Sequence, residues 1–285
     1  GADDAFNQIG QLIGMQQQTP AAYDTLTIVD PGPARAVIEV SGYVFSSDAA
    51  ALDPAIGDSL SVVTRYELRP CEPFVRVSTT LANPLAMDVS IGLGPMIHDV
   101  FLWLWRGPQP FCPAPGQGLS CLEFDIANPF ASVGSFDYVA ARTIAPPWQS
   151  WAVVPESTDQ LFGVNGSTAS ALGALNRVTG SLQTGETVVY DRRFYVGDRG
   201  DIASAVDLAL EGIESLGRRQ AGTISGRVEM ADARAFGDGD PRNALVLFYT
   251  PGAGPSGHEA TQRTAFSAAV PDASGGFSAR LPAGD

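Results

Sequence analysis

The fold class of this chain is decided by Gly222-Thr-Ile-Ser-Gly-Arg-Val228, Ala244-Leu-Val-Leu-Phe-Tyr249 and Gly275-Gly-Phe-Ser-Ala-Arg-Leu-Pro-Ala-Gly284. In the first two stretches every second residue is apolar or small, as in half-buried strands: Ile224, Gly226 and Val228, then Leu245, Leu247 and Tyr249. The third stretch predicts a turn, a short strand and a second turn, and we expect its strand to pair with a strand beyond Asp285. The tail of the chain is therefore predicted to be a small β-sandwich that is incomplete within this sequence.

The composition of the 285 residues is typical of a turn-dense β protein. Apolar residues make up 45% and charged residues 17%, and the chain contains 31 Gly and 21 Pro. This mixture is too apolar for a disordered tail and too rich in glycine and proline for a helical bundle. We therefore predict a mainly β fold, in which a large β-sandwich with a few helices precedes the small sandwich.

The charge balance excludes two classes of partner. The formal net charge of −14 argues against a nucleic acid and against an anionic membrane surface, because both require a cationic face. All 17 basic residues are arginine, which we attribute to biased codon usage. No run of about twenty apolar residues occurs, so no segment is predicted to span a membrane.

The three cysteines leave two alternatives open. Cys112 and Cys121 flank a Pro/Gly-rich loop that a disulfide could close, and Cys71 is then left over. The other alternative is three buried or idle thiols. A bridge would indicate an oxidising compartment. A zinc site is disfavoured, because there is no second cysteine pair and the chain has two histidines.

Hydrophobic periodicity predicts four regions along the chain. They are an N-terminal helix over 1–19, a β-sandwich domain over 20–216, a linker over 217–222 and the small sandwich over 223–285. One face of the N-terminal helix would carry Phe6, Ile9, Leu12 and Ile13. The strands are predicted at 23–29, 36–45, 60–68, 74–81, 88–93, 100–105, 136–144, 150–155, 161–164 and 186–196.

A second helix is predicted with more specific signals. Asp201 is expected to be its N-cap, and Gly217 is expected to end it. The apolar stripe of this helix consists of Ile202, Val206, Ala209, Leu210 and Ile213. The spacing of the stripe predicts one buried face.

Two family resemblances add to these patterns. The order of segments after 222 resembles the carboxypeptidase regulatory-like (prealbumin-like) domain. The stretch from Tyr66 to Asn83 resembles a strand, turn and strand of the non-catalytic N-terminal region of the CehA/McbA family of PHP-type metallohydrolases, although Cys71 stands where that family usually has Gly. The segments Phe111–Gly118 and Gly185–Ile202 resemble further parts of the same region.

The second resemblance implies a bacterial protein that is secreted, periplasmic or on the cell surface. In such enzymes the metal-binding histidines and aspartates lie in a separate C-terminal PHP domain. This chain would then hold no catalytic residue and no cofactor. Its partner would be a downstream catalytic domain of the same chain, and a divalent metal would belong to that domain.

Two pairs of neighbouring residues are candidates for a metal or acid–base site. His98 and Asp99 are adjacent, but His258 lies far away in sequence, so a structural histidine is favoured. Asp238 and Asp240 lie on a tight Gly-Asp-Gly-Asp loop that could hold Ca²⁺. The loop lacks the further spaced ligands of an EF-hand, so a turn is favoured.

Aromatic residues form the weak candidates for a ligand site. Phe101, Trp103 and Trp105 share one face of a strand and could stack on a sugar ring, but the other face of that strand is equally apolar, which favours core packing. Trp148 and Trp151 are weaker candidates for the same kind of sugar-stacking site. Exposure of any of these side chains would favour sugar binding.

The leading functional hypothesis is therefore an accessory, non-catalytic region of an exported PHP-type metal-dependent hydrolase. The alternative is a carbohydrate-binding or cell-surface adhesion module, because regulatory-like and mutarotase-like sandwiches both belong to carbohydrate-binding-like folds. A sugar-processing enzyme is disfavoured by the shortage of histidine and of paired carboxylates.

Overall fold

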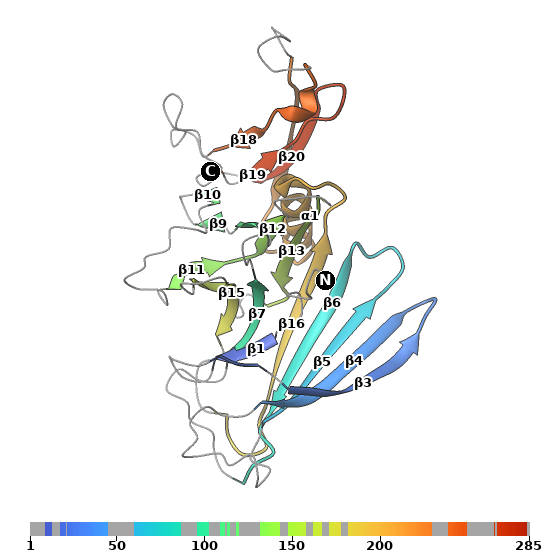
Figure 1. Cartoon of the computed structure of the whole chain (residues 1–285), viewed down its shortest axis with the longest axis vertical. Helices are drawn as coiled ribbons and strands as arrows, with labels where there is room; N and C mark the ends of the chain where they lie inside the picture. Colours follow the sequence, from blue (N-terminus) through green and yellow to red (C-terminus); the bar gives the residue numbers. More distant parts are fainter. Residues whose placement is uncertain are drawn as a thin grey trace. The chain divides into compact units, whose positions relative to one another are not determined.

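The structure is a computed structural model, and it is mainly β, with antiparallel sheets and few helices, as the sequence predicts (Figure 1). It describes residues 9–12, 18–20, 22–44, 60–86, 96–102, 109–111, 113–114, 118–119, 132–142, 148–157, 162–166, 171–177, 182–229, 239–249, 265 and 267–283. The chain divides into two compact units, each built from several separate segments. The first unit consists of residues 1–104, 126–135 and 155–194, and the second of 105–125, 136–154 and 195–285.

The first unit contains an antiparallel sheet in which four strands follow one another in chain order. They are β3 (Ala22–Pro31), β4 (Ala36–Val44), β5 (Leu60–Leu68) and β6 (Phe74–Ala82), and they lie side by side in Figure 1. The strand β16 (Thr187–Val196) follows β6 in this sheet, and the last two residues of β16 belong to the second unit. All five strands lie within two residues of their predicted ranges.

The two faces of this sheet differ because successive side chains of a strand point in opposite directions. One face is buried and carries Val62, Thr64, Val77, Thr79 and Leu81. In the middle of this face Thr64 and Thr79 hydrogen-bond through their hydroxyls at 3.2 Å. The other face carries polar residues, and Glu67 of β5 stands directly opposite Arg76 of β6.

A second sheet of the first unit corrects one sequence prediction. Its order is β11 (Ser132–Phe136), β14 (Phe162–Gly166), β15 (Ala171–Arg177), β7 (Met96–Leu102), β1 (Ile9–Leu12) and β2 (Gln18–Pro20). Residues 9–12 were predicted to be helical, but they pair with both β2 and β7. Pairing on two sides satisfies the backbone of these residues and overrides the helical spacing of the apolar side chains. The strand predicted at 88–93 lies outside the described residues.

The second unit contains short strands from distant parts of the chain. Three of them, β8 (Gln109–Phe111), β12 (Val139–Arg142) and β13 (Ser150–Pro155), lie in one sheet. The others form three antiparallel pairs: β9 (Pro113–Ala114) with β10 (Gly118–Leu119), β17 (Ala221–Arg227) with β20 (Gly276–Pro282), and β18 (Val246–Phe248) with β19 (Ser267–Ala269). Pro155, the last residue of β13, belongs to the first unit. A 3-10 helix, η4, covers Pro241–Asn243.

The helix α1 (Ile202–Ser215) confirms the prediction made for it. Asp201 is the N-cap, and its carboxylate accepts a hydrogen bond from the backbone N–H of Ser204. Gly217 follows the C-cap with φ 72°, a conformation that favours glycine. The predicted stripe is buried and consists of Ile202, Val206, Ala209, Leu210 and Ile213. In the described part of the chain, no helix is long and apolar enough to cross a membrane.

The C-terminal strands correct one further expectation. The strand β20 pairs along one edge with β17, from Ala221 opposite Pro282 to Arg227 opposite Gly276, and a partner strand beyond Asp285 stays a prediction. Ile224 of β17 is 48% exposed, so that strand is not half-buried. The reason is that β17 and β20 form a two-stranded sheet, which leaves much of its surface in solvent.

The inward face of β18 is the opposite of the predicted one. Val246 and Phe248 pack on a small core, whereas Leu245, Leu247 and Tyr249 were expected to be the alternating inward set. The buried members of this core are Ala203, Phe248, Ala269 and Ala279. Ala203 belongs to α1, so the helix and the C-terminal strands share a core in the second unit. The apolar run of 245–248 allows either face inward, and only packing against α1 and β20 decides between them.

Candidate functional site

The second unit contains a cavity of about 820 Å³, which lies within the size range of small-ligand sites. Its walls come from β12, the entry to α1, η4 and the C-terminal strands. The side chains that decide its chemistry are Arg142, Trp148, Arg199, Arg242, Asp272 and Phe277. Asp201 also lines the cavity, so the described part of the wall contains two aromatic rings, three guanidiniums and two carboxylates.

Two glycines, Gly200 and Gly226, leave room for the aromatic residues Trp148 and Phe277 of the cavity wall. Trp148 is 58% exposed, and a Cβ added at Gly200 would lie 2.2 Å from the Trp148 Cβ. Phe277 lies over Gly226, where an added Cβ would come within 2.6 Å of its ring. Any larger residue at Gly200 would therefore displace the backbone beside Trp148. The cavity combines one exposed indole with one partly buried phenyl ring.

Both carboxylates in the cavity wall are bonded to donors of the protein itself. Asp201 is only 2% exposed; its Oδ1 accepts from the Ser204 N–H at 2.9 Å, and its Oδ2 accepts from the Val270 N–H at 2.9 Å. The Oδ1 of Asp272 accepts from the backbone and hydroxyl of Ser274 and from the N–H of Gly276, at 2.7–2.9 Å. These hydrogen bonds, the hydroxyl one first, lower the pKa of Asp272, so this carboxylate is ionised at neutral pH.

The three arginines of the wall are held in different ways. Arg199 donates from Nε to Asp201 at 3.2 Å and lies 3.6 Å from Asp198 through Nη1. Burial would lower the pKa of Arg199, but the Asp201 carboxylate raises it overall. Burial lowers the pKa of Arg142, and the nearby Asp201 opposes this effect in part.

Arg242 is held by Asp240, one of the two sequence candidates for a metal site. The guanidinium donates from Nε and Nη2 to the Asp240 carboxylate at 2.5–2.9 Å, and Oδ1 also accepts the Arg242 backbone N–H. Asp240 is the N-cap of η4, which is the turn role that the sequence favoured. Asp238 lies outside the described residues. Among those that are described, no three His, Cys, Asp or Glu side chains come together to hold a metal ion.

The other aromatic and cysteine candidates from the sequence differ in exposure, or lie outside the described residues. Trp151 is buried at 5% exposure, in contrast to Trp148. The Phe101 backbone lies in β7, while Trp103 and Trp105 lie outside the described residues. Cys112 and Cys121 also lie outside them, and Cys71 carries a free, exposed thiol.

The His98–Asp99 pair lies within β7. The backbone of His98 is opposite Gly10 of β1 and Leu175 of β15, and Asp99 is opposite Ile9 and Ala174. The pair thus belongs to a central strand of the second sheet of the first unit. The described residues that line the cavity include none of this strand.

Sequence analysis missed the arginines and Asp272 of the cavity. Arg142 and Arg242 lie far apart in the chain, and no local pattern connects them. The one available signal was Trp148, which was named only as a weak aromatic candidate. The residues Asp198-Arg-Gly-Asp201 were identified only as the entry to a helix, although Arg199 and Gly200 also line the cavity.

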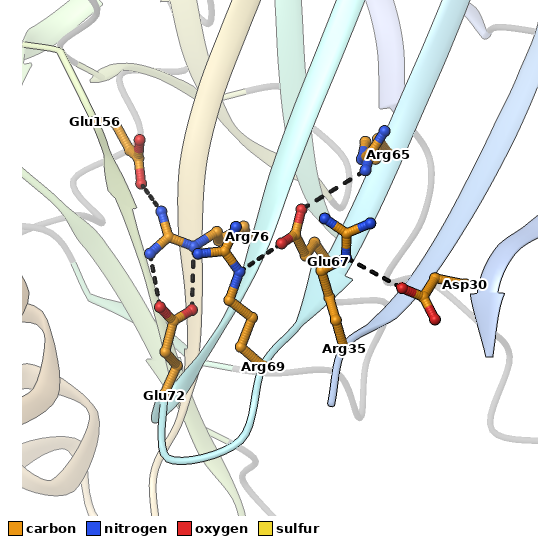
Figure 2. Close-up of polar contacts among 8 residues, drawn as sticks. All are labelled: Asp30, Arg35, Arg65, Glu67, Arg69, Glu72, Arg76 and Glu156. Atoms are coloured by element: carbon orange, nitrogen blue, oxygen red, sulfur yellow. Dashed lines mark hydrogen bonds and ion pairs between the residues drawn. The ribbon is translucent and has the colours of Figure 1, made fainter. Parts of the chain in front are cut away.

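A second group of charges surrounds Arg76 on the polar face of β5 and β6 in the first unit, and Figure 2 shows its members Glu72, Arg76 and Glu156. Arg76 donates to both oxygens of Glu72, at 2.8 and 3.1 Å, and lies 3.5 Å from Glu156. Glu156 also accepts from Arg193 at 2.9 Å. The guanidiniums of Arg76 and Arg193 lie 5.2 and 4.8 Å from the centre of the Phe74 ring. We call these five residues the ionic cluster.

Further pairs continue along this face. Glu67 accepts from Arg69 at 2.5 Å and lies 3.9 Å from Arg65, and Arg35 pairs with Asp30 at 3.3 Å (Figure 2). A hydrogen bond from Arg76 lowers the pKa of Glu72. The space beside the ionic cluster is small, at about 290 Å³. The charges of this face pair with one another, so the arrangement fits a role in holding strands and turns together.

Comparisons with known proteins were made with family models, curated proteins and solved structures. Neither the family models nor the curated proteins gave a match. The solved structures include a proposed aldose 1-epimerase of Klebsiella pneumoniae, with 12% identity, a TM-score of 0.39, and 70% of this chain and 59% of that chain covered. The α-galactosidase AgaA (GH36) of Geobacillus stearothermophilus has 12% identity, a TM-score of 0.38, and coverage of 73% and 32%.

A galactose mutarotase-like protein of Lactobacillus casei is also similar, with 11% identity, a TM-score of 0.32, and coverage of 67% of this chain and 83% of that chain. The chain thus spans 59% and 32% of the length of the first two structures. At such low identity and TM-score these likenesses carry no argument about function. The function has to be inferred from the residues of the chain itself.

Proposed function

We propose that this chain is a carbohydrate-binding β module that holds a sugar in the cavity of the second unit, against the indole ring of Trp148. The observation that carries the proposal is the exposure of Trp148, 58%, in the wall of a cavity of about 820 Å³. A large aromatic surface in water is unfavourable until a ligand covers it. The C–H face of a sugar ring is such a cover, and its hydroxyls can bond to the polar groups around the indole.

The polar groups of the cavity support binding rather than bond cleavage. Glycoside hydrolysis needs two carboxylates that can act on one bond. Asp201 and Asp272, the carboxylates of the wall, accept hydrogen bonds from backbone donors, and Asp201 is buried. Their positions suit carboxylates that shape a loop and cap a helix.

The proposal is tested by a glycan array, followed by calorimetric titration of the sugars that bind. We expect Trp148→Ala to weaken binding about tenfold, because stacking and burial of the ring contribute about 1–2 kcal/mol. Trp148→Phe should retain part of the affinity. The matched control is Tyr43→Ala, which removes an aromatic ring that is 46% exposed in the first unit.

Two results would contradict the proposal. One is an array on which no sugar binds the folded chain. The other is a sugar whose affinity falls equally in Trp148→Ala and Tyr43→Ala. Circular dichroism of each variant ensures that a loss of binding is not a loss of folding.

A second candidate function is the accessory role in an exported PHP-type hydrolase, and one observation favours the resemblance on which it rests. Cys71 has φ 65°, in the left-handed region, and it stands where that family usually has Gly. The turn thus has the backbone conformation that a glycine there would adopt. In this role the chain would hold a downstream catalytic domain that binds the divalent metal.

The accessory role predicts that residues 1–285 fold without hydrolase activity in the presence of Mn²⁺ or Zn²⁺. Turnover of phosphoester or glycoside substrates by these residues alone, dependent on added metal, would contradict it. Calorimetric titration of the same preparation with each metal provides the direct control, because tight metal binding by these residues would also contradict it.

A further inference from the structure

The two carboxylates in the described part of the cavity wall differ in what they leave for a ligand. Both oxygens of Asp201 accept from groups of the protein, and only 2% of this residue is exposed. Asp272 is exposed, and its Oδ1 accepts from Ser274 and Gly276, but no described residue donates to its Oδ2. An ionised carboxylate accepts hydrogen bonds at both oxygens, so the Oδ2 of Asp272 can accept from a bound molecule.

The turn that carries Asp272, between β19 and β20, is held by backbone hydrogen bonds. The Asp272 N–H donates to the Gly276 carbonyl at 2.8 Å, and the Gly275 N–H donates to the Asp272 carbonyl at 2.9 Å. The Gly275 carbonyl accepts from the Val228 N–H at 2.8 Å, which joins the turn to the residue after β17. Because Oδ1 is bonded within this turn, the carboxylate is held in place before a ligand arrives, which lowers the entropic cost of binding.

The arginines of the wall have carboxylates of the protein beside them. Arg242 has Asp240, Arg199 has Asp201 and Asp198, and Arg142 has Asp201. An anionic ligand would compete with these carboxylates for the guanidiniums, and it would also meet the charge of Asp272. A cationic ligand would meet the three guanidiniums. The wall therefore favours a ligand without a net charge.

From these contacts, and resting on the proposed function, we infer that the cavity binds a neutral saccharide and that Asp272 selects it by accepting a hydrogen bond from a sugar hydroxyl. The sugar ring would lie against Trp148, and the hydroxyl would donate to Oδ2 of Asp272. Such a bond is charge-assisted and roughly twice as strong as one between neutral groups. A uronic acid would bring a second negative charge to Asp272, and an amino sugar would bring a positive charge to the arginines.

The experiment is a calorimetric titration of residues 1–285 with oligosaccharides that form charged and neutral pairs. Oligogalacturonate is compared with its methyl ester, and a chitosan oligomer with the N-acetylated chitin oligomer of the same length. Cello- and xylo-oligosaccharides add neutral sugars of other kinds. We expect at least one neutral oligomer to bind, and we expect each charged oligomer to bind about fivefold more weakly than its neutral counterpart.

Asp272→Asn tests the residue directly. Asparagine keeps an oxygen that accepts from Ser274 and Gly276 but replaces Oδ2 by an NH2 group, which is a donor. Affinity for the neutral sugar should fall about tenfold, because a hydrogen bond to a charged group is lost, whereas affinity for oligogalacturonate should not fall. The matched control is Asp30→Asn in the first unit, because Asp30 also accepts from a turn N–H, that of Gly32. It should change neither affinity.

Deoxy analogues of the neutral sugar distinguish a direct contact from an effect on the turn. Removal of the hydroxyl that donates to Asp272 should weaken binding to the wild-type protein as much as Asp272→Asn weakens binding of the parent sugar. That analogue should bind equally well to both proteins, because the contact is already lost. If Asp272→Asn weakens every analogue by the same factor as the parent sugar, Asp272 acts through the shape of the turn and the inference is overturned.

The outcomes separate this inference from the proposed function. If Trp148→Ala weakens binding of a neutral sugar and Asp272→Asn leaves it unchanged, the inference is overturned and carbohydrate binding stands. Tighter binding of oligogalacturonate than of its ester, or an equal loss in Asp30→Asn, also overturns the inference. If no saccharide binds, both fail. If circular dichroism shows that Asp272→Asn is unfolded, the charged and neutral pairs decide: tighter binding of the neutral member supports the inference, and equal or weaker binding overturns it.

Discussion

The ionic cluster of the first unit and the cavity of the second unit both contain arginines, carboxylates and an aromatic ring, but the contacts among these groups differ. On the first unit, Arg76 meets Glu72 and Glu156, so cation and anion are matched within the fold. In the cavity, Asp201 accepts from the backbone N–H groups of Ser204 and Val270 and from Arg199, so this carboxylate holds the entry to α1 and a neighbouring loop. The comparison teaches that arginines and carboxylates can join strands and turns on one surface and shape the wall of a cavity on another.

The largest expected effect concerns a carboxylate of the second unit, Asp207, on which burial outweighs the opposing effects of Arg199 and Arg280. Asp207 of α1 accepts from the Arg280 N–H, and burial raises its pKa from 3.8 to about 6. The native state therefore holds this proton more tightly than the unfolded chain, and the stabilisation is lost as pH rises from about 4 through 6. The full effect would be about 3 kcal/mol, and we expect about 1–2 kcal/mol because solvent reaches part of the side chain.

This effect is measured by chemical denaturation at pH 5 and pH 7.5, with amide hydrogen exchange to assign the change to α1. Asp207→Asn keeps an oxygen that accepts from Arg280 and should remove this part of the pH dependence. Glu72 of the ionic cluster should behave in the opposite way, because its pKa is lowered. A wild-type α1 whose protection increases with pH over this range would contradict the prediction.

A smaller effect is expected at the centre of the ionic cluster. Arg76→Met should lower the free energy of unfolding of the first unit by about 1 kcal/mol, because it removes a two-oxygen pair with Glu72 and the contact with the Phe74 ring. Arg35→Met is the matched control, because Arg35 makes a single pair with the half-buried Asp30, and it should change stability by less than about 0.5 kcal/mol. Sugar affinity should be unchanged in both variants. If Arg76→Met lost sugar affinity at unchanged stability, the ionic cluster would bind ligand rather than stabilise the fold, and this prediction would be wrong.

Much of the fold was predictable where local patterns determine it. The alternation in 60–68 and 74–81 placed β5 and β6, and the cap and stripe placed α1 within a few residues. The strands β15 and β19 were missed, because Ala171-Leu-Gly-Ala-Leu and Ser267-Ala-Ala lack the β-branched and aromatic residues typical of strands. Their strand structure depends on pairing with β7 and β18, which no local signal contains.

The cavity was less predictable than the fold. Trp148 and Trp151 are three positions apart and looked equivalent in sequence, yet one is exposed and the other buried. Their difference depends on Gly200, which is distant in the chain and lets the Trp148 backbone lie against it. The arginines come from three separate segments. Such long-range contacts leave no periodic pattern in a single sequence.

The smallest expected effect lies in the turn between β5 and β6, which carries Arg69 and Glu72 of the polar face. Cys71 has φ 65°, a conformation that is unfavourable for a residue with a Cβ by about 1 kcal/mol or more. Cys71→Gly removes that strain but increases the entropy of the unfolded chain, so we expect a net gain of about 0.5 kcal/mol in the free energy of unfolding. Chemical denaturation under reducing conditions measures it.

Cys71→Ala is the matched control, because alanine also removes the thiol but keeps a Cβ at the same φ. It should give no gain, so a difference between the two variants isolates the backbone strain from the chemistry of sulfur. Equal gains in both would show that the thiol was the unfavourable group. If Cys71→Gly gave no gain in the free energy of unfolding, the pairs around Glu72 and Arg76 would determine the turn more strongly than residue 71 does. The ionic cluster would then contribute more to stability than we expect.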